Sequence, residues 1–327
     1  MKNFQWTEPQ TIEQAIAWLA KANGKAVLMA GGTDLFTEMK EGVVEPDLVI
    51  DLKSIPGLAS IQKDKNGIRI GALTTIAGLA ADAMIKLDYP GLSAAAASLA
   101  TPQLRNVGTV GGNLCQRPRC WYYRDAQMAC RKKGGSQCFA AKGRNKYHAI
   151  LGGGICHIVY PSDLAPMLVA LDAQVTISSP KGDKSMPLAE FYALPAKNVR
   201  RENVLAPDEL VREVKIPLAE TGTRSAYVKL KERETWDFAL VSAAVRGTVS
   251  GGGLGDVAIV LGGVAPIPWR LGKTEASLKG KKLSQTLVKE ALRGDLQEAR
   301  PLAENGYKTV LVEAAVTRAL LSLARPL

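Results

Sequence analysis

The stretch Ala30-Gly31-Gly32-Thr33-Asp34-Leu35 ends a short apolar run that begins at residue 26. Its two glycines let the backbone approach a ligand closely, and successive amide N–H groups in such a turn can bind phosphate oxygens. A helix that begins near Asp34 would add the positive end of its dipole. The stretch matches neither the Walker A nor the Rossmann G-x-G-x-x-G pattern. Alone, it predicts either a phosphate-binding turn or an ordinary turn between a strand and a helix.

A second glycine loop follows further along the chain, Thr101-Pro-Gln-Leu-Arg-Asn-Val-Gly-Thr-Val-Gly-Gly-Asn113. It offers exposed amides, a hydroxyl and an arginine that suits a diphosphate. Two such loops from separate subdomains would hold a dinucleotide across their interface, and the pair is more informative than either loop. The candidate residues of the two loops are Ala30, Gly31, Gly32, Thr33, Asp34, Leu35, Thr101, Arg105, Asn106, Thr109, Gly111, Gly112 and Asn113.

The sequence on either side of the loops predicts alternating helices and strands. The segment after about residue 220 has strand-like runs and two terminal helices, and glycines 251–253 predict a hairpin turn. Helices are expected at 11–22, 93–100 and 164–170, and strands at 26–30, 48–52, 68–70, 174–177, 209–216, 226–230, 240–249 and 256–261.

The cysteines are the least ordinary feature of the composition. All five lie between Cys115 and Cys156, in a segment without sustained periodicity that predicts a long insertion. Their spacing, C-x4-C-x9-C-x7-C-x17-C, lacks the paired C-x2-C of common zinc modules, and an odd number argues against a closed disulfide framework. Four thiolates on a long loop suit a [4Fe–4S] cluster. Zinc, with His148 or His157 as a ligand, and unligated thiols are the alternatives.

Composition sets the broad class. The chain has 327 residues, of which 46% are hydrophobic and 22% charged, which is typical of globular proteins. Its net charge of +11 is scattered, so we expect a solvated surface or an acidic partner and no nucleic acid. No apolar run is long enough to span a bilayer, and no signal-peptide pattern begins the sequence, so we expect a cytoplasmic protein without membrane insertion. With two histidines and no G-x-S-x-G, no catalytic residue is predicted.

Three further features are less specific. Asp163 precedes the expected helix at 164–170 and is a candidate cap. Lys229 lies on an expected strand and would by default be a solvated charge. The aromatic run 121–123 either packs within the insertion or stacks on a cofactor.

Four motifs in order resemble the FAD-binding medium subunit of the molybdenum hydroxylases, the xanthine dehydrogenase and aldehyde oxidoreductase family. The cysteine-bearing insertion resembles the subgroup of that family with an extra [4Fe–4S] cluster, which includes the flavin subunit of 4-hydroxybenzoyl-CoA reductase. The four motifs are Ala30–Leu35, Thr109-Val-Gly-Gly-Asn113, Pro161-Ser-Asp-Leu-Ala-Pro166 and Gly262-Gly-Val-Ala-Pro-Ile-Pro-Trp-Arg270.

The resemblance implies an α+β fold: a vanillyl-alcohol-oxidase-type FAD-binding domain at 1–219, followed by a smaller C-terminal α+β domain at 220–327. The FAD-binding domain would have two parts, 1–54 and 55–219, with the cysteine-rich insertion at about 115–156. The backbones of both glycine motifs would hold the FAD diphosphate and ribityl chain. Asp163 would sit in the same pocket, and Val211 and Lys229 match weaker family contacts.

The resemblance also implies a cluster ligand set. Cys120, Cys130 and Cys138 match the first three ligands. The reductase places the fourth ligand soon after the third, where this chain has Tyr147 and His148, so Cys156 is taken as the fourth. Cys115 is then the remaining thiol, and the choice between it and Cys156 stays open.

The implied function is electron transfer. Substrate would react at a molybdenum centre on a partner large subunit, and electrons would cross the [2Fe–2S] clusters of a partner small subunit to reach FAD here. An external acceptor would then take them, and the complex would be a heterotrimer. A signal-bearing partner could alternatively carry the complex to the periplasm. The alternatives are a stand-alone FAD oxidoreductase and a basic zinc-binding interaction protein without enzymatic activity.

Overall fold

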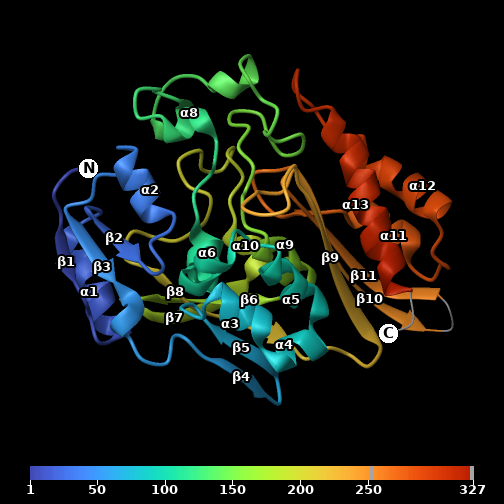
Figure 1. Cartoon of the computed structure of the whole chain (residues 1–327), viewed down its shortest axis with the longest axis horizontal. Helices are drawn as coiled ribbons and strands as arrows, with labels where there is room; N and C mark the ends of the chain where they lie inside the picture. Colours follow the sequence, from blue (N-terminus) through green and yellow to red (C-terminus); the bar gives the residue numbers. More distant parts are fainter. Residues whose placement is uncertain (251–252, 325–327) are drawn as a thin grey trace.

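The computed structural model describes residues 1–250 and 253–324. Three β-sheets follow one another along the chain (Figure 1). The first is a parallel sheet of three strands in the order β1-β3-β2. Its strands are β1 (Gln5–Thr7), β2 (Ala26–Met29) and β3 (Leu48–Asp51), accompanied by α1 (Ile12–Ala22), α2 (Leu35–Lys40) and the 3₁₀ turn Leu52–Ser54.

The first helix and strand form as the sequence predicts. Thr11 caps α1, because its Oγ1 accepts a hydrogen bond from the Gln14 amide at 3.2 Å. Ile16 and Leu19 recur at helical spacing and are buried against the sheet. Strand β2 ends directly before the first glycine loop, and α2 begins directly after Asp34. The expected helix near Asp34 is therefore confirmed.

The second sheet is antiparallel, with five strands in the order β4-β5-β8-β6-β7, and a layer of short helices packs beside it (Figure 1). Its strands are β4 (Ile61–Asp64), β5 (Gly67–Gly71), β6 (Gln174–Ser179), β7 (Gly182–Pro187) and β8 (Leu210–Pro217). Its helices are α3 (Ile76–Ala81), α4 (Ala83–Asp88), α5 (Pro90–Ala97), α6 (Pro102–Val107), α7 (Val110–Cys115), α9 (Leu164–Ala170) and α10 (Leu188–Phe191).

One helix boundary differs from its prediction. The alanine-rich helix expected at 93–100 runs over Pro90–Ala97. Pro90 occupies the first turn, where its fixed φ and missing N–H cost nothing, so the helix starts earlier. Ala100 adopts a φ of +43°, which ends any helical continuation.

The cysteine-rich insertion carries little regular structure, as its sequence predicts. It contains α8 (Trp121–Arg124) and two 3₁₀ turns, Arg131–Lys133 and Phe139–Ala141. In Figure 1 it lies at the top of the molecule, between α2 and α13. The insertion therefore spans from the N-terminal part of the chain to the C-terminal part.

The third sheet is antiparallel, with four strands in the order β12-β11-β10-β9. Three helices follow it within the described residues, one more than expected, because residues 272–278 form a separate short helix after β12. Of the expected hairpin turn, Gly251 and Gly252 lie outside the described residues. The elements are β9 (Thr223–Leu230), β10 (Val241–Ser250), β11 (Gly253–Gly262), β12 (Trp269–Arg270), α11 (Gly272–Leu278), α12 (Gln285–Leu296) and α13 (Tyr307–Leu323).

No helix in the described residues is both long enough and apolar enough to cross a lipid bilayer.

Candidate functional site

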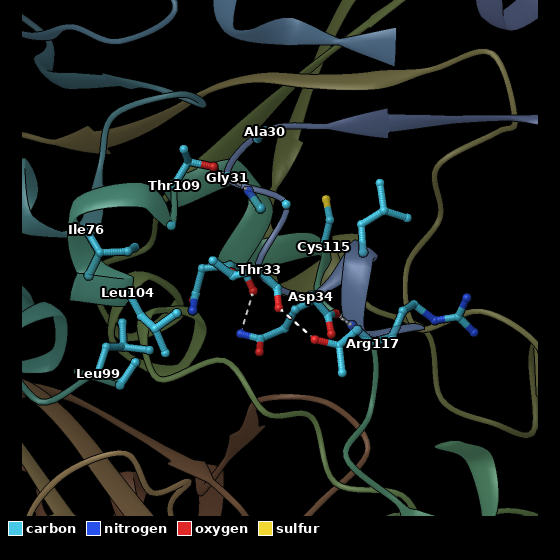
Figure 2. Close-up of a pocket in the computed structure, with 18 of the residues that line it drawn as sticks. Ala30, Gly31, Thr33, Asp34, Ile76, Leu99, Leu104, Thr109, Cys115 and Arg117 are labelled. Atoms are coloured by element: carbon cyan, nitrogen blue, oxygen red, sulfur yellow. Dashed lines mark hydrogen bonds between the residues drawn. The ribbon is translucent and has the colours of Figure 1, made fainter. Parts of the chain in front are cut away.

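The two glycine loops meet backbone to backbone. A Cβ atom added to Gly31 would lie 2.3 Å from the carbonyl oxygen of Val107, so only glycine fits there. Gly32 has a φ of +70°, which also favours glycine. Figure 2 shows Gly31 beside Thr109 of the second loop. The glycines thus bring together loops that are about seventy residues apart in sequence.

A cavity of about 470 Å³, called the glycine-loop cavity below, lies along these loops. Ile76, Leu99 and Leu104 give one part of its wall an apolar character (Figure 2). The predicted residues on its wall are Ala30, Gly31, Gly32, Thr33, Asp34, Leu35, Arg105, Thr109, Gly112, Asn113 and Asp163.

Five predicted residues do not line this cavity. Thr101 caps α6 by accepting the Leu104 amide at 3.3 Å. Asn106 is exposed, and Val211 belongs to the apolar core. Gly111 packs against Ala72, where an added Cβ would come within 2.8 Å of the alanine side chain. The fifth, Lys229, contacts Asp163, which does line the cavity.

The two loops differ in their free amides. The N–H groups of residues 31–34 donate no hydrogen bond to the chain within the described residues. In the second loop, the Gly111 amide donates to Ala72 O at 2.8 Å and the Asn113 amide to Thr109 O at 2.8 Å. Val110 and Gly112 are likewise bonded. The expectation of exposed amides there is wrong for 110–113, because these amides form the first turn of α7 and its contact with the sheet.

Three arginines lie on the cavity wall, and they differ in their partners. Arg117 pairs with Glu202 at 2.7 Å, and Arg119 pairs with Asp34. Arg105 donates to the carbonyl of Leu99 at 2.5 Å and forms no ion pair among the described residues. Arg105 therefore keeps a positive charge that no carboxylate of the described chain neutralises.

Asp34 joins the first loop to the insertion. Its Oδ1 accepts hydrogen bonds from Arg119 and, at 2.7 Å, from Arg124, while its Oδ2 accepts the Arg117 amide at 2.7 Å. Burial alone would raise the pKa of this carboxyl, but the two guanidinium groups and the amide hold it below its ordinary value. Asp34 is thus a charged contact to residues on both sides of Cys120.

Asp163 and Lys229 form a buried ion pair. Lys229 Nζ lies 2.8 Å from Asp163 Oδ2, and the Tyr227 hydroxyl donates to Oδ1 at 2.7 Å. The expectation that Lys229 is solvated is wrong, because β9 packs against α5 and directs the ammonium inward, toward Asp163 and the carbonyl of Ser98. The Asp163 side chain also makes no capping bond; Ser162 Oγ accepts the amide three residues later instead.

The structure separates the five cysteines into two places. Cys120, Cys130, Cys138 and Cys156 line one small cavity, together with His148 and His157. Cys115 lies on the wall of the glycine-loop cavity, where burial raises its pKa to about 12 (Figure 2). The four cysteines that the sequence selects as ligands are therefore neighbours, and the remaining thiol is elsewhere.

Amide groups surround the sulfur atoms of the small cavity. The backbone N–H groups of Tyr122 and Tyr123 favour the thiolate form of Cys120, and that of Ile158 favours the thiolate form of Cys156. The neighbouring Cys156 thiol lowers the pKa of Cys138. Burial raises the pKa of Cys120 to about 11. Within the described residues, no three or more His, Cys, Asp or Glu side chains form a group that could hold a metal ion.

The aromatic run after Cys120 packs within the insertion. The Trp121 ring contacts Tyr122, Tyr147 and His148 edge-on, with ring centroids 5.6 to 6.1 Å apart. Tyr123 is buried and donates to Glu38 Oε1 at 2.7 Å. The packing alternative is therefore confirmed for these residues.

A second cavity of about 490 Å³ lies between the first two. It shares Arg119, Asp163 and Phe238 with the glycine-loop cavity. It shares Cys120 and His148 with the small, cysteine-lined cavity. Three neighbouring cavities that share wall residues therefore lie between the glycine loops and the cysteines.

The sequence did not single out several of these lining residues. Arg117 and Arg119 directly precede the first ligand candidate, and the two positive charges in Arg117-Pro-Arg119-Cys120 were a usable indication of a charged site. Residues 236–238 reach the cavity from the loop between β9 and β10, and no motif marks them.

Two family models match the chain. The FAD binding domain in molybdopterin dehydrogenase matches residues 2–219, and the CO dehydrogenase flavoprotein C-terminal domain matches residues 225–323. Fold and cavity thus define a FAD-binding oxidoreductase subunit.

Relatives cover nearly the whole chain. The aldehyde oxidoreductase FAD-binding subunit PaoB of Escherichia coli is 36% identical over 98% of both chains. The nicotinate dehydrogenase FAD-subunit of Eubacterium barkeri is 27% identical over 92% of this chain and 90% of its own. The structure of the carbon monoxide dehydrogenase of Hydrogenophaga pseudoflava includes a chain 26% identical, with a TM-score of 0.78 over 98% and 97% of the two chains. The chain belongs to the family of FAD-binding subunits of molybdenum hydroxylase-type dehydrogenases.

Proposed function

We propose that this chain is the FAD- and [4Fe–4S]-carrying electron-transfer subunit of a heteromeric molybdenum hydroxylase. Its partners would be a large molybdenum-cofactor subunit and a small [2Fe–2S] subunit, and an external acceptor would take the electrons. When bound, the flavin and the cluster supply the redox chemistry, and the chain supplies binding and electrostatics. The observation that carries the proposal is the series of neighbouring cavities between the glycine loops and the four cysteines that line one small cavity.

The glycine-loop cavity suits FAD. Free amides at residues 31–34 offer hydrogen bonds to phosphate oxygens, and Arg105 offers an unneutralised positive charge. The apolar part formed by Ile76, Leu99 and Leu104 suits a ring system. Among the predicted contacts outside the wall, Lys229 would act through its ion pair with Asp163.

The small cavity suits a [4Fe–4S] cluster. Its four cysteines come from an insertion with little core of its own, and backbone amides already point at three of the sulfurs. Such a cluster binds each cysteine at a different iron, whereas a zinc ion needs its ligands to converge on one point.

The intermediate cavity supports a relay role for the cluster. Cys120 and Asp163 both line it, so the two cofactor sites are separated by one shared space. Arg119, next to Cys120 in sequence, reaches the cavity wall on the flavin side. This proximity favours electron exchange between the two groups over a purely structural cluster.

Cofactor analysis of the purified chain tests the proposal. An anaerobic visible spectrum, with iron and acid-labile sulfide counted against released flavin, should give one FAD with about four irons and four sulfides. Serine variants at Cys120, Cys130, Cys138 and Cys156 should each lose iron. The matched variant Cys115→Ser should keep it, because that thiol lies in the other cavity. Flavin without iron would overturn the cluster, and zinc without flavin would overturn the whole proposal.

Copurification tests the partners. Tagged chain expressed with its native complement should elute with two other subunits, one carrying molybdenum and one [2Fe–2S] clusters. Because the 36%-identical relative is named an aldehyde oxidoreductase subunit, aldehydes are the first substrates to assay. An isolated chain that oxidises substrate by itself would favour the stand-alone FAD oxidoreductase.

A further inference from the structure

The end of the insertion is held by the segment that leads into α13. The Glu304 carboxylate accepts the Asn145 amide at 2.7 Å. The Asn305 side chain donates to the His148 carbonyl at 3.0 Å. Lys308 Nζ donates to the carbonyl of Tyr147, also at 3.0 Å. These bonds fix the backbone on both sides of His148 against the C-terminal domain.

This clamp places the His148 ring beside a predicted cluster ligand. His148 Nε2 lies 3.2 Å from Cys120 Sγ, and the residue is only 3% exposed. Its ring packs edge-on against Trp121 and tilted against Tyr122. Two parts of the insertion that are 28 residues apart in sequence thus meet at one sulfur atom.

When the cluster is bound, this hydrogen bond has a defined direction, with His148 as the donor. A ligating cysteine is a thiolate and has no proton to donate, so the bond requires a proton on Nε2. The other ring nitrogen, Nδ1, is buried and has no hydrogen-bond partner within the described residues.

We propose that His148 is a positioning residue that donates its Nε2–H to the Cys120 thiolate and raises the reduction potential of the cluster, without being a ligand itself. This inference rests on the proposed function, because it requires the cluster. Reduction adds negative charge to the iron and its sulfurs, and a hydrogen bond to a more negative sulfur is stronger. The bond therefore stabilises the reduced form more than the oxidised form.

His157 provides a matched control. It is the other histidine of the chain and lines the same cavity. Its ring packs close to Gly153, where an added Cβ would lie 2.6 Å from Nδ1. No hydrogen bond joins its ring to a cysteine sulfur in the described part of the chain. A change at His157 thus alters the cavity without removing the donor.

The experiment compares His148→Phe, His148→Gln and His157→Gln in the chain as purified, with any subunits that accompany it. Iron and sulfide per chain are counted first, and the reduced cluster signal is then followed by EPR during a redox titration. In His148→Phe we expect full iron and a reduction equilibrium about tenfold less favourable, which is about 59 mV for one electron. His148→Gln can still donate an N–H and should recover part of the shift. His157→Gln should shift the potential less than His148→Phe does, because it removes no hydrogen bond to a cysteine sulfur.

The outcomes separate this inference from the proposed function. Full iron with unchanged potential in His148→Phe would overturn the inference and leave the cluster in place. Loss of iron in both His148 variants would make His148 a ligand, which also overturns it. A wild-type chain without iron would overturn the proposed cluster, and this inference with it.

Discussion

The ammonium group of Lys229 lies 2.8 Å from Oδ2 of Asp163, and each side chain is only 3% exposed. Lys229 belongs to β9 of the third sheet, whereas Asp163 directly precedes α9 and lines the glycine-loop cavity. One buried ion pair therefore connects the C-terminal sheet to that cavity. Because buried charges are strongly destabilising when unpaired, this contact constrains both elements.

Replacing Lys229 tests that constraint. In Lys229→Met, the Asp163 carboxylate would keep only the Tyr227 hydroxyl as a side-chain partner. We expect the free energy of unfolding to fall by about 3 kcal/mol or more, with weaker retention of FAD. Urea denaturation and flavin content after gel filtration measure both. The control Lys273→Met breaks an exposed pair with Glu298 and should cost much less. Equal costs for the two variants would contradict the buried pair's role.

Gly31→Ala tests the contact between the glycine loops. The new methyl group would meet the Val107 carbonyl at 2.3 Å, so the loops must separate. We expect FAD affinity to fall at least about tenfold, measured by flavin fluorescence during titration, because the loops form one cavity wall. The control Gly272→Ala has no heavy atom within 4 Å of the added methyl and should bind FAD normally. Wild-type affinity in Gly31→Ala would show that the loops need not touch.

The sequence was informative where the chemistry is local. Gly31 and the four clustered cysteines could be identified because a turn, or a ligand set on one loop, leaves its pattern in neighbouring residues. Thr11 could be assigned as a helix cap for the same reason. The cap and the turn depend on a few consecutive positions, and the cysteines lie within one segment of the chain.

Other parts of the site depend on contacts that span the chain. Lys229 is buried because β9 packs against a helix more than a hundred residues earlier, which strand alternation cannot show. Asp34 meets arginines of the insertion, and no motif announces that pairing. The amides at 110–113 look free in the sequence but are bonded to Thr74, Ala72 and Thr109. Long-range packing decided these cases.

Asp34→Asn tests whether the first glycine loop holds the insertion. The amide would leave Arg119 without a carboxylate and Arg124 with only its longer pair to Glu41, so we expect a loss of about 3 kcal/mol in the free energy of unfolding. Hydrogen exchange of the amides at 117–124 should also accelerate. Because the folded-state pKa of Asp34 is lowered, its contribution is present above about pH 4 and is lost as pH falls through the folded value. The exposed Asp47→Asn should leave exchange at 117–124 unchanged; acceleration there too would sink the idea.

Lys308 gives the C-terminal domain a pH-dependent stability. Its ammonium is fully buried and donates to the carbonyls of Tyr147 and Gly263, with no carboxylate partner in the described part of the chain. Burial lowers the pKa of Lys308 to about 7. The unfolded chain, with an ordinary lysine pKa of about 10.4, then binds more protons between pH 7 and 10. Folding stability should therefore rise with pH across that window, by on the order of 3 kcal/mol from this group.

The difference between wild type and Lys308→Met isolates this contribution, because the other titrating groups are common to both. Urea denaturation at pH 7, 8 and 9 should give a wild-type stability that rises relative to the variant by roughly 1 kcal/mol per pH unit. Lys289→Met, which breaks a half-exposed pair with Glu313 on neighbouring helices, should follow wild type at each pH. If wild type and Lys308→Met run parallel from pH 7 to 9, the buried ammonium keeps its proton throughout. The two carbonyl contacts would then be enough to stabilise the charge.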